Sequence, residues 1–118
     1  MMMMIVHVLS RKEWEAAVIN GVYRAASLEK EGFIHCSPVD KIVAVANYNY
    51  HGTKGLVLLC LDASKIKSEV IWEDLYNEGR EYPHIYGELN LDAVSHTYDF
   101  EPNTEGEFSL PTDLENMR

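Results

Sequence analysis

The sequence predicts an α+β domain with a largely antiparallel sheet, and three observations lead to this prediction. Helix signals gather in the first half of the chain and strand signals in the second half. The later strands are separated by connections too short for the crossover helices that parallel strands need. With 118 residues, 47% of them hydrophobic, the chain has the size and composition of one domain with one core. We expect this domain to span residues 1–118, with an ordered core over about 4–111 and a loose C-terminal tail.

The first strand and the first helix have clear local signals. Residues 3–9 are rich in β-forming residues, which predicts a strand with His7 near its end. Ser10 and Glu13 have the spacing of a capping box, so a helix should begin at residue 11. Gly21 supplies the residue that ends it.

A second strand and a second helix are predicted before the middle of the chain. Residues 22–31 are less regular and read as a loop with one helical turn, followed by a strand over 33–37. Ser37 is then expected to cap a helix that has Pro38 in its first turn. The residues from 52 to 55 include two glycines and should end this helix.

Strands dominate the remainder of the sequence. Residues 56–61 form a continuous apolar run, which is typical of a central strand, and residues 70–73 form the next strand. Residues 74–87 are predicted to be a long ordered loop, and such loops in compact domains are usually functional. Two closing strands are expected over 89–92 and 93–100.

Charge and cysteine content exclude several classes of function. The net charge of −9 disfavours a sequence-independent grip on a nucleic-acid backbone. Cys36 and Cys60 have no metal-ligand spacing around them, so we expect reduced thiols, a cytoplasmic protein and no metal. We also expect no secretory segment and no membrane span.

Three histidines lie on predicted strands or in a constrained loop, namely His7, His35 and His84. An imidazole can act as a general base or donate a hydrogen bond to a ribose or phosphate group. The alternative is that each histidine only bonds a carbonyl in the core. A three-histidine metal site is a further alternative, but these residues form no short-range ligand pair.

Other polar residues near the histidines also have a functional and a structural interpretation. Neighbouring residues of a strand point to opposite faces, so if His35 faces a cleft then Cys36 faces the core and is a poor nucleophile. Ser37 should share the face of His35, although its role as a helix cap is equally compatible with the pattern. Glu73 is either a catalytic carboxylate or a solvated charge at a strand edge.

The chain from about Ile5 to Pro111 resembles the family catalogued as domain of unknown function 952. The resemblance rests on an early histidine before a helix with a tryptophan and on four later motifs, which are Gly32-Phe33-Ile34-His35-Cys36-Ser37, the strand ending at Glu73, Pro83-His84-Ile85-Tyr86-Gly87 and the close at Gly106-x-Phe108-x-Leu110-Pro111. This family carries no established activity.

The order of elements also resembles the ADP-ribosyltransferase fold, most closely the NAD-dependent RNA 2′-phosphotransferases. That resemblance implies a split, mostly antiparallel sheet with two helices in the N-terminal half. It also implies that His7 meets the ribose or pyrophosphate of NAD, and that His35 and Ser37 line the nicotinamide pocket. In this chain Val8-Leu9 replaces the family's Gly-Thr, and the basic residues that bind RNA phosphate are mostly missing. The place of the late catalytic residue of those enzymes could be taken in this chain by Glu73, by Glu88 or by the His84/Tyr86 pair.

The leading hypothesis is therefore an NAD-dependent ADP-ribosyl or ribosyl transferase, or a diverged relative that binds an NAD-derived nucleotide. NAD would be the substrate and a small-molecule nucleotide the partner, and the protein would be a monomer or weak homodimer. The site residues expected to be catalytic are His35, Glu73 and His84, and those expected to bind the nucleotide are His7, Arg24, Ser37 and Tyr86. The alternative is a non-enzymatic ligand- or protein-binding module that uses a face with Trp72, Tyr82 and Tyr86; a hydrolase without a cofactor is the third reading.

Overall fold

The computed structural model describes residues 3–116, which form three antiparallel sheets and four α-helices. The largest sheet has the strand order β4 (Ser37–Pro38), β1 (Met4–Ser10), β5 (Leu56–Asp62) and β9 (Val94–Phe100). A three-stranded sheet has the order β3 (Ile34–His35), β7 (Tyr82–Tyr86) and β6 (Glu69–Glu73), and β2 (Val22–Tyr23) pairs with β8 (Leu89–Asn90). Every one of these pairings is antiparallel, which confirms the predicted α+β class.

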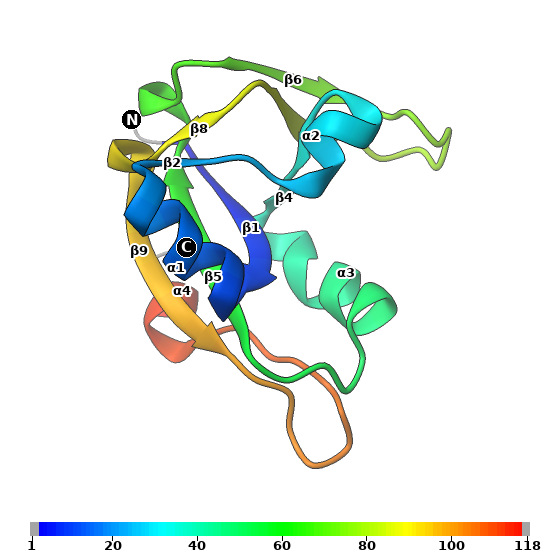
Figure 1. Cartoon of the computed structure of the whole chain (residues 1–118). Helices are drawn as coiled ribbons and strands as arrows, with labels where there is room; N and C mark the ends of the chain where they lie inside the picture. The colour runs from blue at the N-terminus through cyan, green and yellow to red at the C-terminus, as the bar shows by residue number, and fades with distance from the viewer. Residues whose placement is uncertain (1–2, 117–118) are drawn as a thin grey trace.

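The helices are α1 (Arg11–Asn20), α2 (Ala26–Glu31), α3 (Ile42–Asn49) and α4 (Thr112–Asn116), with short 3₁₀ turns η1 (Val39–Lys41), η2 (Ala63–Lys65) and η3 (Leu91–Ala93). Figure 1 shows β1 and β5 at the centre, with α1 and α3 on different sides of them and β6 above. No helix within residues 3–116 has both the length and the apolar character needed to cross a membrane.

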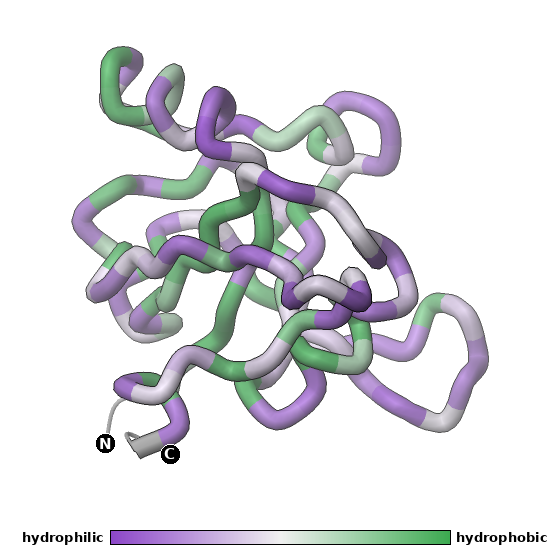
Figure 2. The backbone as a smooth tube through the Cα atoms, turned by 90° about the horizontal axis from the view of Figure 1, so that it is seen from below, coloured by the Kyte–Doolittle hydropathy of each residue, from purple (hydrophilic) through white to green (hydrophobic). Residues whose placement is uncertain are grey.

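The two central strands of the four-stranded sheet, β1 and β5, are buried on both faces, whereas the edge strand β9 is mostly exposed. All seven residues of β5 are buried, which explains why this strand is a continuous apolar run in the sequence. In β1, Ile5 and Leu9 pack into one hydrophobic cluster, with α1 and the inner face of the three-stranded sheet. Val6 and Val8 pack into the second cluster, with α3 and α4. Figure 2 shows hydrophobic segments running through the middle of the molecule, whereas loop 74–81, at the right of Figures 1 and 2, is mostly hydrophilic.

The predicted capping box at the start of α1 is confirmed. The amide of Glu13 donates to the Ser10 hydroxyl at 3.1 Å, and the Ser10 amide donates to the Glu13 carboxylate at 3.0 Å. Gly21 ends the helix with a φ of 79°, a conformation that glycine adopts without a steric penalty.

The predicted strand over residues 33–37 is divided between two sheets, which corrects two expectations. β3 pairs with β7, the amide of Cys36 still bonds the Pro83 carbonyl at 3.1 Å, and Ser37 then pairs with Val6 of β1. Ser37 is therefore a buried strand residue and not a helix cap, since η1 and α3 begin after it with no side-chain cap. The argument that Ser37 shares the face of His35 also fails, because a strand that changes sheets does not keep one alternation.

Three further expectations differ from the structure. Residues 82–86 form β7, so the ordered loop is limited to residues 74–81. The N-terminal half has a third helix, α2, where one helical turn was expected. The tail is not loose over its described part, because α4 places Leu114, which has no exposed surface, against Phe100 and Phe108; residues 117 and 118 lie outside the described residues.

Candidate functional site

The candidate site lies on the outer face of the three-stranded sheet. The inner face of this sheet carries Ile34, Ile85 and Val70, which belong to the hydrophobic core and are neighbours in register. Since side chains alternate along a strand, His35 and His84, which are also paired in register, point to the opposite side. We call the group formed by Phe33, His35, Glu73, His84 and Tyr86 the outer-face cluster.

Aromatic contacts hold the cluster together around Phe33. The ring of Phe33 stacks on His84 with 4.3 Å between centroids and meets the edge of His35 at 4.8 Å. Tyr86 lies 5.3 Å from Phe33, and the two imidazoles meet edge to face at 5.4 Å. These distances are those of packed aromatic pairs, so the rings restrict one another's rotation.

Glu73 is the hydrogen-bonding centre of the cluster. Its Oε2 accepts from the Tyr86 hydroxyl and, at 2.8 Å, from Nδ1 of His84. These two bonds, that from Tyr86 first, hold the pKa of the Glu73 carboxyl below its ordinary value, so the group stays ionised at neutral pH. The hydrogen bond between the Tyr86 hydroxyl and Glu73 also raises the pKa of Tyr86 to about 12. Within residues 3–116, Oε1 of Glu73 has no protein partner, and the side chain is 21% exposed.

His84 is almost fully buried, with 3% of its side chain exposed. Its Nδ1 carries a proton, because the ionised carboxylate opposite it can only accept. None of the buried side-chain nitrogen and oxygen atoms of the described residues lacks a partner, and Nε2 makes no hydrogen bond with these residues. Nε2 therefore retains contact with solvent at the surface of the cluster.

His35 is the accessible imidazole of the cluster. Its side chain is 42% exposed, and its Nε2 lies 2.8 Å from a carboxylate oxygen of Glu31, the last residue of α2. Cys36 is buried beside it, and burial raises the pKa of its thiol. This agrees with the prediction that Cys36 faces the core and is a poor nucleophile.

His7 lies in the interior and not in the outer-face cluster. Its Nδ1 donates to the backbone carbonyl of His35 at 2.5 Å, and its Nε2 accepts from the Tyr23 hydroxyl at 2.9 Å. Burial lowers its pKa from 6.5 to about 4, so the ring is neutral at neutral pH. His7 thereby connects β1 with β2 and β3, and both of its nitrogens are already bonded.

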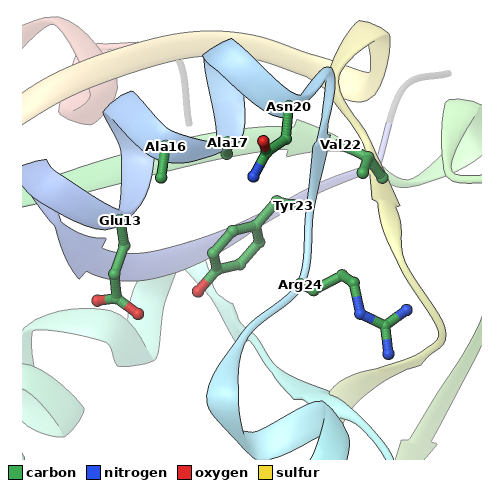
Figure 3. A pocket seen from close by; sticks show the side chains of 7 residues that line it. All are labelled: Glu13, Ala16, Ala17, Asn20, Val22, Tyr23 and Arg24. Atoms are coloured by element: carbon green, nitrogen blue, oxygen red, sulfur yellow. The ribbon is translucent and has the colours of Figure 1, made fainter.

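A hollow of about 180 Å³ lies between α1 and the segment that contains β2, and Tyr23, the partner of His7, is one of its lining residues. It is lined by Glu13, Ala16, Ala17, Asn20, Val22, Tyr23 and Arg24. Figure 3 shows the Tyr23 ring between the carboxylate of Glu13 on one side and the guanidinium of Arg24 on the other. Arg24 pairs with Glu88 at 2.8 Å, two residues after Tyr86.

The structure thus brings together four of the seven predicted site residues, His35, Glu73, His84 and Tyr86. The other three lie apart from them: Arg24 in its ion pair at the end of β7, His7 in the interior, and Ser37 in another sheet. Sequence reasoning missed Phe33 as a member of the cluster, Glu31 as the partner of His35 and Tyr23 as the partner of His7. Only Glu31 had a usable signal, which is its spacing of four residues from His35.

No group of three or more ligand-type side chains among residues 3–116 is placed to hold a metal ion.

Comparisons with known proteins identify a family but no activity. The chain is similar to the crystal structure of protein CC0527 from Caulobacter crescentus, with a TM-score of 0.85 and 30% identity over 95% of this chain and 98% of that chain. A crystal structure of a doubly substituted variant of CC0527 gives the same values, and its solution NMR structure matches with a TM-score of 0.77 and 30% identity over 88% and 90% of the two chains. No match is found among curated proteins. The model of the family described as "protein of unknown function (DUF952)" matches residues 8–97, and the chain belongs to that family.

Proposed function

We propose that the outer-face cluster binds an NAD-derived nucleotide and that the protein catalyses ADP-ribosyl or ribosyl transfer from NAD. The observation that carries the proposal is the carboxylate of Glu73, which is ionised, held by two donors and left with one oxygen free toward solvent. The resemblance in order of elements to NAD-dependent transferases supports the choice of nucleotide.

The chemistry of this reaction needs such a carboxylate. When the bond between ribose C1′ and nicotinamide breaks, positive charge develops on the ribose ring. An anion fixed in place before the reaction stabilises that charge without a cost of reorganisation. Tyr86 and His84 donate to the same oxygen of Glu73 and so hold the carboxylate in one orientation.

One residue of the cluster and one residue outside it suit the rest of a nucleotide. Tyr86 is half-buried and offers an aromatic ring next to the carboxylate, so it can stack on a base. Arg24 follows β2 outside the cluster, has a half-exposed side chain and pairs with Glu88 just after β7, and a pyrophosphate would compete with Glu88 for its guanidinium. His7 acts in this proposal by positioning the strand of His35 and not by touching the nucleotide.

A specific observation also favours the alternative of a non-enzymatic binding module. Trp72, Leu75 and Tyr76 are 36%, 49% and 62% exposed, and they lie at the end of β6 and the start of the following loop. Large apolar side chains exposed together are typical of an interaction surface. Binding of a nucleotide without release of nicotinamide would favour this alternative.

The test is calorimetric titration of the protein with NAD and with ADP-ribose, together with chromatographic measurement of nicotinamide release. We expect Glu73→Gln to retain binding of ADP-ribose and to lower kcat by about 100-fold, as is common when one preorganised electrostatic group is lost. Glu69→Gln is the matched control, because it removes the same charge from the same strand without breaking a bond of the cluster. Absence of binding of both ligands to the unmodified protein would refute the proposal.

A further inference from the structure

We infer that His35 accepts the proton of a hydroxyl acceptor through Nδ1 and that Glu31 is the positioning residue that holds the imidazole for this task. The inference rests on the proposed function and names the class of acceptor, which is water or an alcohol hydroxyl. Neither the role of Glu31 nor the acceptor class follows from the sequence motifs.

The bond between His35 and Glu31 determines which ring nitrogen is available. Nε2 lies 2.8 Å from Oε2 of Glu31, and a carboxylate can only accept, so Nε2 carries the proton. In the neutral imidazole the lone pair is then on Nδ1, for which the described residues provide no hydrogen-bond partner. With 42% of its side chain exposed, His35 can be reached from solvent, whereas His84 is nearly buried.

The backbone before His35 is built to hold this geometry. Glu31 ends α2, and Gly32 follows in the left-handed conformation with a φ of 90°. The hydroxyl of Ser27 donates to the carbonyl of Phe33 at 2.8 Å, which ties α2 to the start of β3. The ring of Phe33 and the ring of His84 then flank the imidazole at 4.8 and 5.4 Å. Among residues 3–116, Glu31 therefore supplies the one polar contact that sets the rotation of the ring between two aromatic neighbours.

The ring of His84 lies between the proposed base, His35, and the proposed anion, Glu73. His35 contacts His84 edge to face, and Nδ1 of His84 donates to Glu73 at 2.8 Å. A general base beside the charge-stabilising carboxylate is needed when the acceptor must lose a proton, as a hydroxyl or water must. An acceptor that is already an anion, such as a phosphate, would not need it.

The reaction balances with these groups. The bond between ribose C1′ and the nicotinamide nitrogen breaks, and its electron pair leaves with neutral nicotinamide. A bond forms between C1′ and the acceptor oxygen, and the acceptor's proton moves to Nδ1 of His35, which later releases it to solvent.

The experiment compares Glu31→Ala and Glu31→Gln with Glu29→Ala, which removes an exposed carboxylate from the same helix. Kinetics are measured with NAD in water and in the presence of methanol. Transfer to water gives ADP-ribose, and transfer to methanol gives its methyl glycoside. Two-dimensional NMR measures cross-relaxation between the ring protons of His35 and those of Phe33 and His84.

We expect Glu31→Ala to lower kcat by about 10- to 100-fold for both acceptors with KM for NAD unchanged, and to weaken the cross-relaxation of His35. Glu31→Gln keeps an acceptor for Nε2 and should restore the ring contacts and most of kcat, and Glu29→Ala should behave as the unmodified protein. Nicotinamide release that is undiminished in Glu31→Ala, or ring contacts that do not change, would overturn the inference while leaving the proposed function in place. Absence of nucleotide binding to the unmodified protein would instead remove the proposed function and this inference with it.

Discussion

The buried histidine His7 makes folding stability depend on pH in a way that can be calculated. Its pKa is about 4 in the folded protein and 6.5 for an unperturbed histidine, as in the unfolded chain. Between these pH values the unfolded chain therefore binds a proton that the folded chain does not. The free energy of unfolding therefore decreases as the pH drops through 6.5. Below a pH of about 4, His7 makes no further contribution to this decrease. For one such group the loss between pH 7 and pH 4.5 is about 2.5 kcal/mol.

The perturbation that isolates this effect is His7→Gln. Glutamine does not titrate, and its amide can still donate to the His35 carbonyl and accept from the Tyr23 hydroxyl. We expect the substitution to destabilise the protein at pH 7 because the amide fits the two partners less well than the ring. At pH 4.5 the difference between the two proteins should shift by about 2.5 kcal/mol in favour of the variant.

The assay is equilibrium unfolding in urea at pH 7 and at pH 4.5, followed by circular dichroism. Carboxyl groups titrate in both proteins, so their contributions cancel in the difference between variant and parent. Ile34→Val is the control, since it perturbs a fully buried residue without changing any titrating group and should cost the same at both pH values. A difference between His7→Gln and the parent that is equal at the two pH values would refute the assignment of His7 as a buried neutral imidazole.

Three other predictions concern packing and the site. A Cβ at Gly87 would lie 2.4 Å from the hydroxyl oxygen of Ser68 and 2.9 Å from its Cβ, so Gly87→Ala should lower the free energy of unfolding by about 1–3 kcal/mol, and adding Ser68→Gly should recover part of it in urea denaturation. Leu114→Ala should cost about 2–5 kcal/mol in the same assay, because Leu114 is fully buried; a loss near zero would show that the C-terminal helix is not docked. Tyr86→Phe removes the first of the two bonds that lower the pKa of Glu73, so that pKa should rise in a carboxyl-detected NMR titration, and an unchanged value would contradict the bond.

Part of the candidate site was predictable because its residues are unusual for their local setting. His35 and His84 are polar residues at strand positions bounded by glycine or proline, and Glu73 is a charged residue at the end of an apolar strand, so the sequence alone marks them as worth testing. Their convergence was not predictable, because β3, β6 and β7 are short and the pairing of β3 with β7 joins residues about 50 positions apart in the chain.

The sequence by itself determined the elements whose cause is local. The capping box of α1 and its glycine stop involve residues three and four positions apart, and the apolar run of β5 records burial on both faces. The net charge and the α+β class also follow from composition and from the order of the elements.

Only the tertiary structure decided where the chain changes sheets and which polar groups meet. The switch at Cys36 depends on β1 and β7 competing for consecutive residues of one segment, and no local preference encodes that division. The same holds for His7, which could have faced a ligand but finds both of its hydrogen-bond partners inside the protein. A buried polar side chain is satisfied by whichever donors and acceptors the packed elements bring to it, and these come from distant parts of the chain.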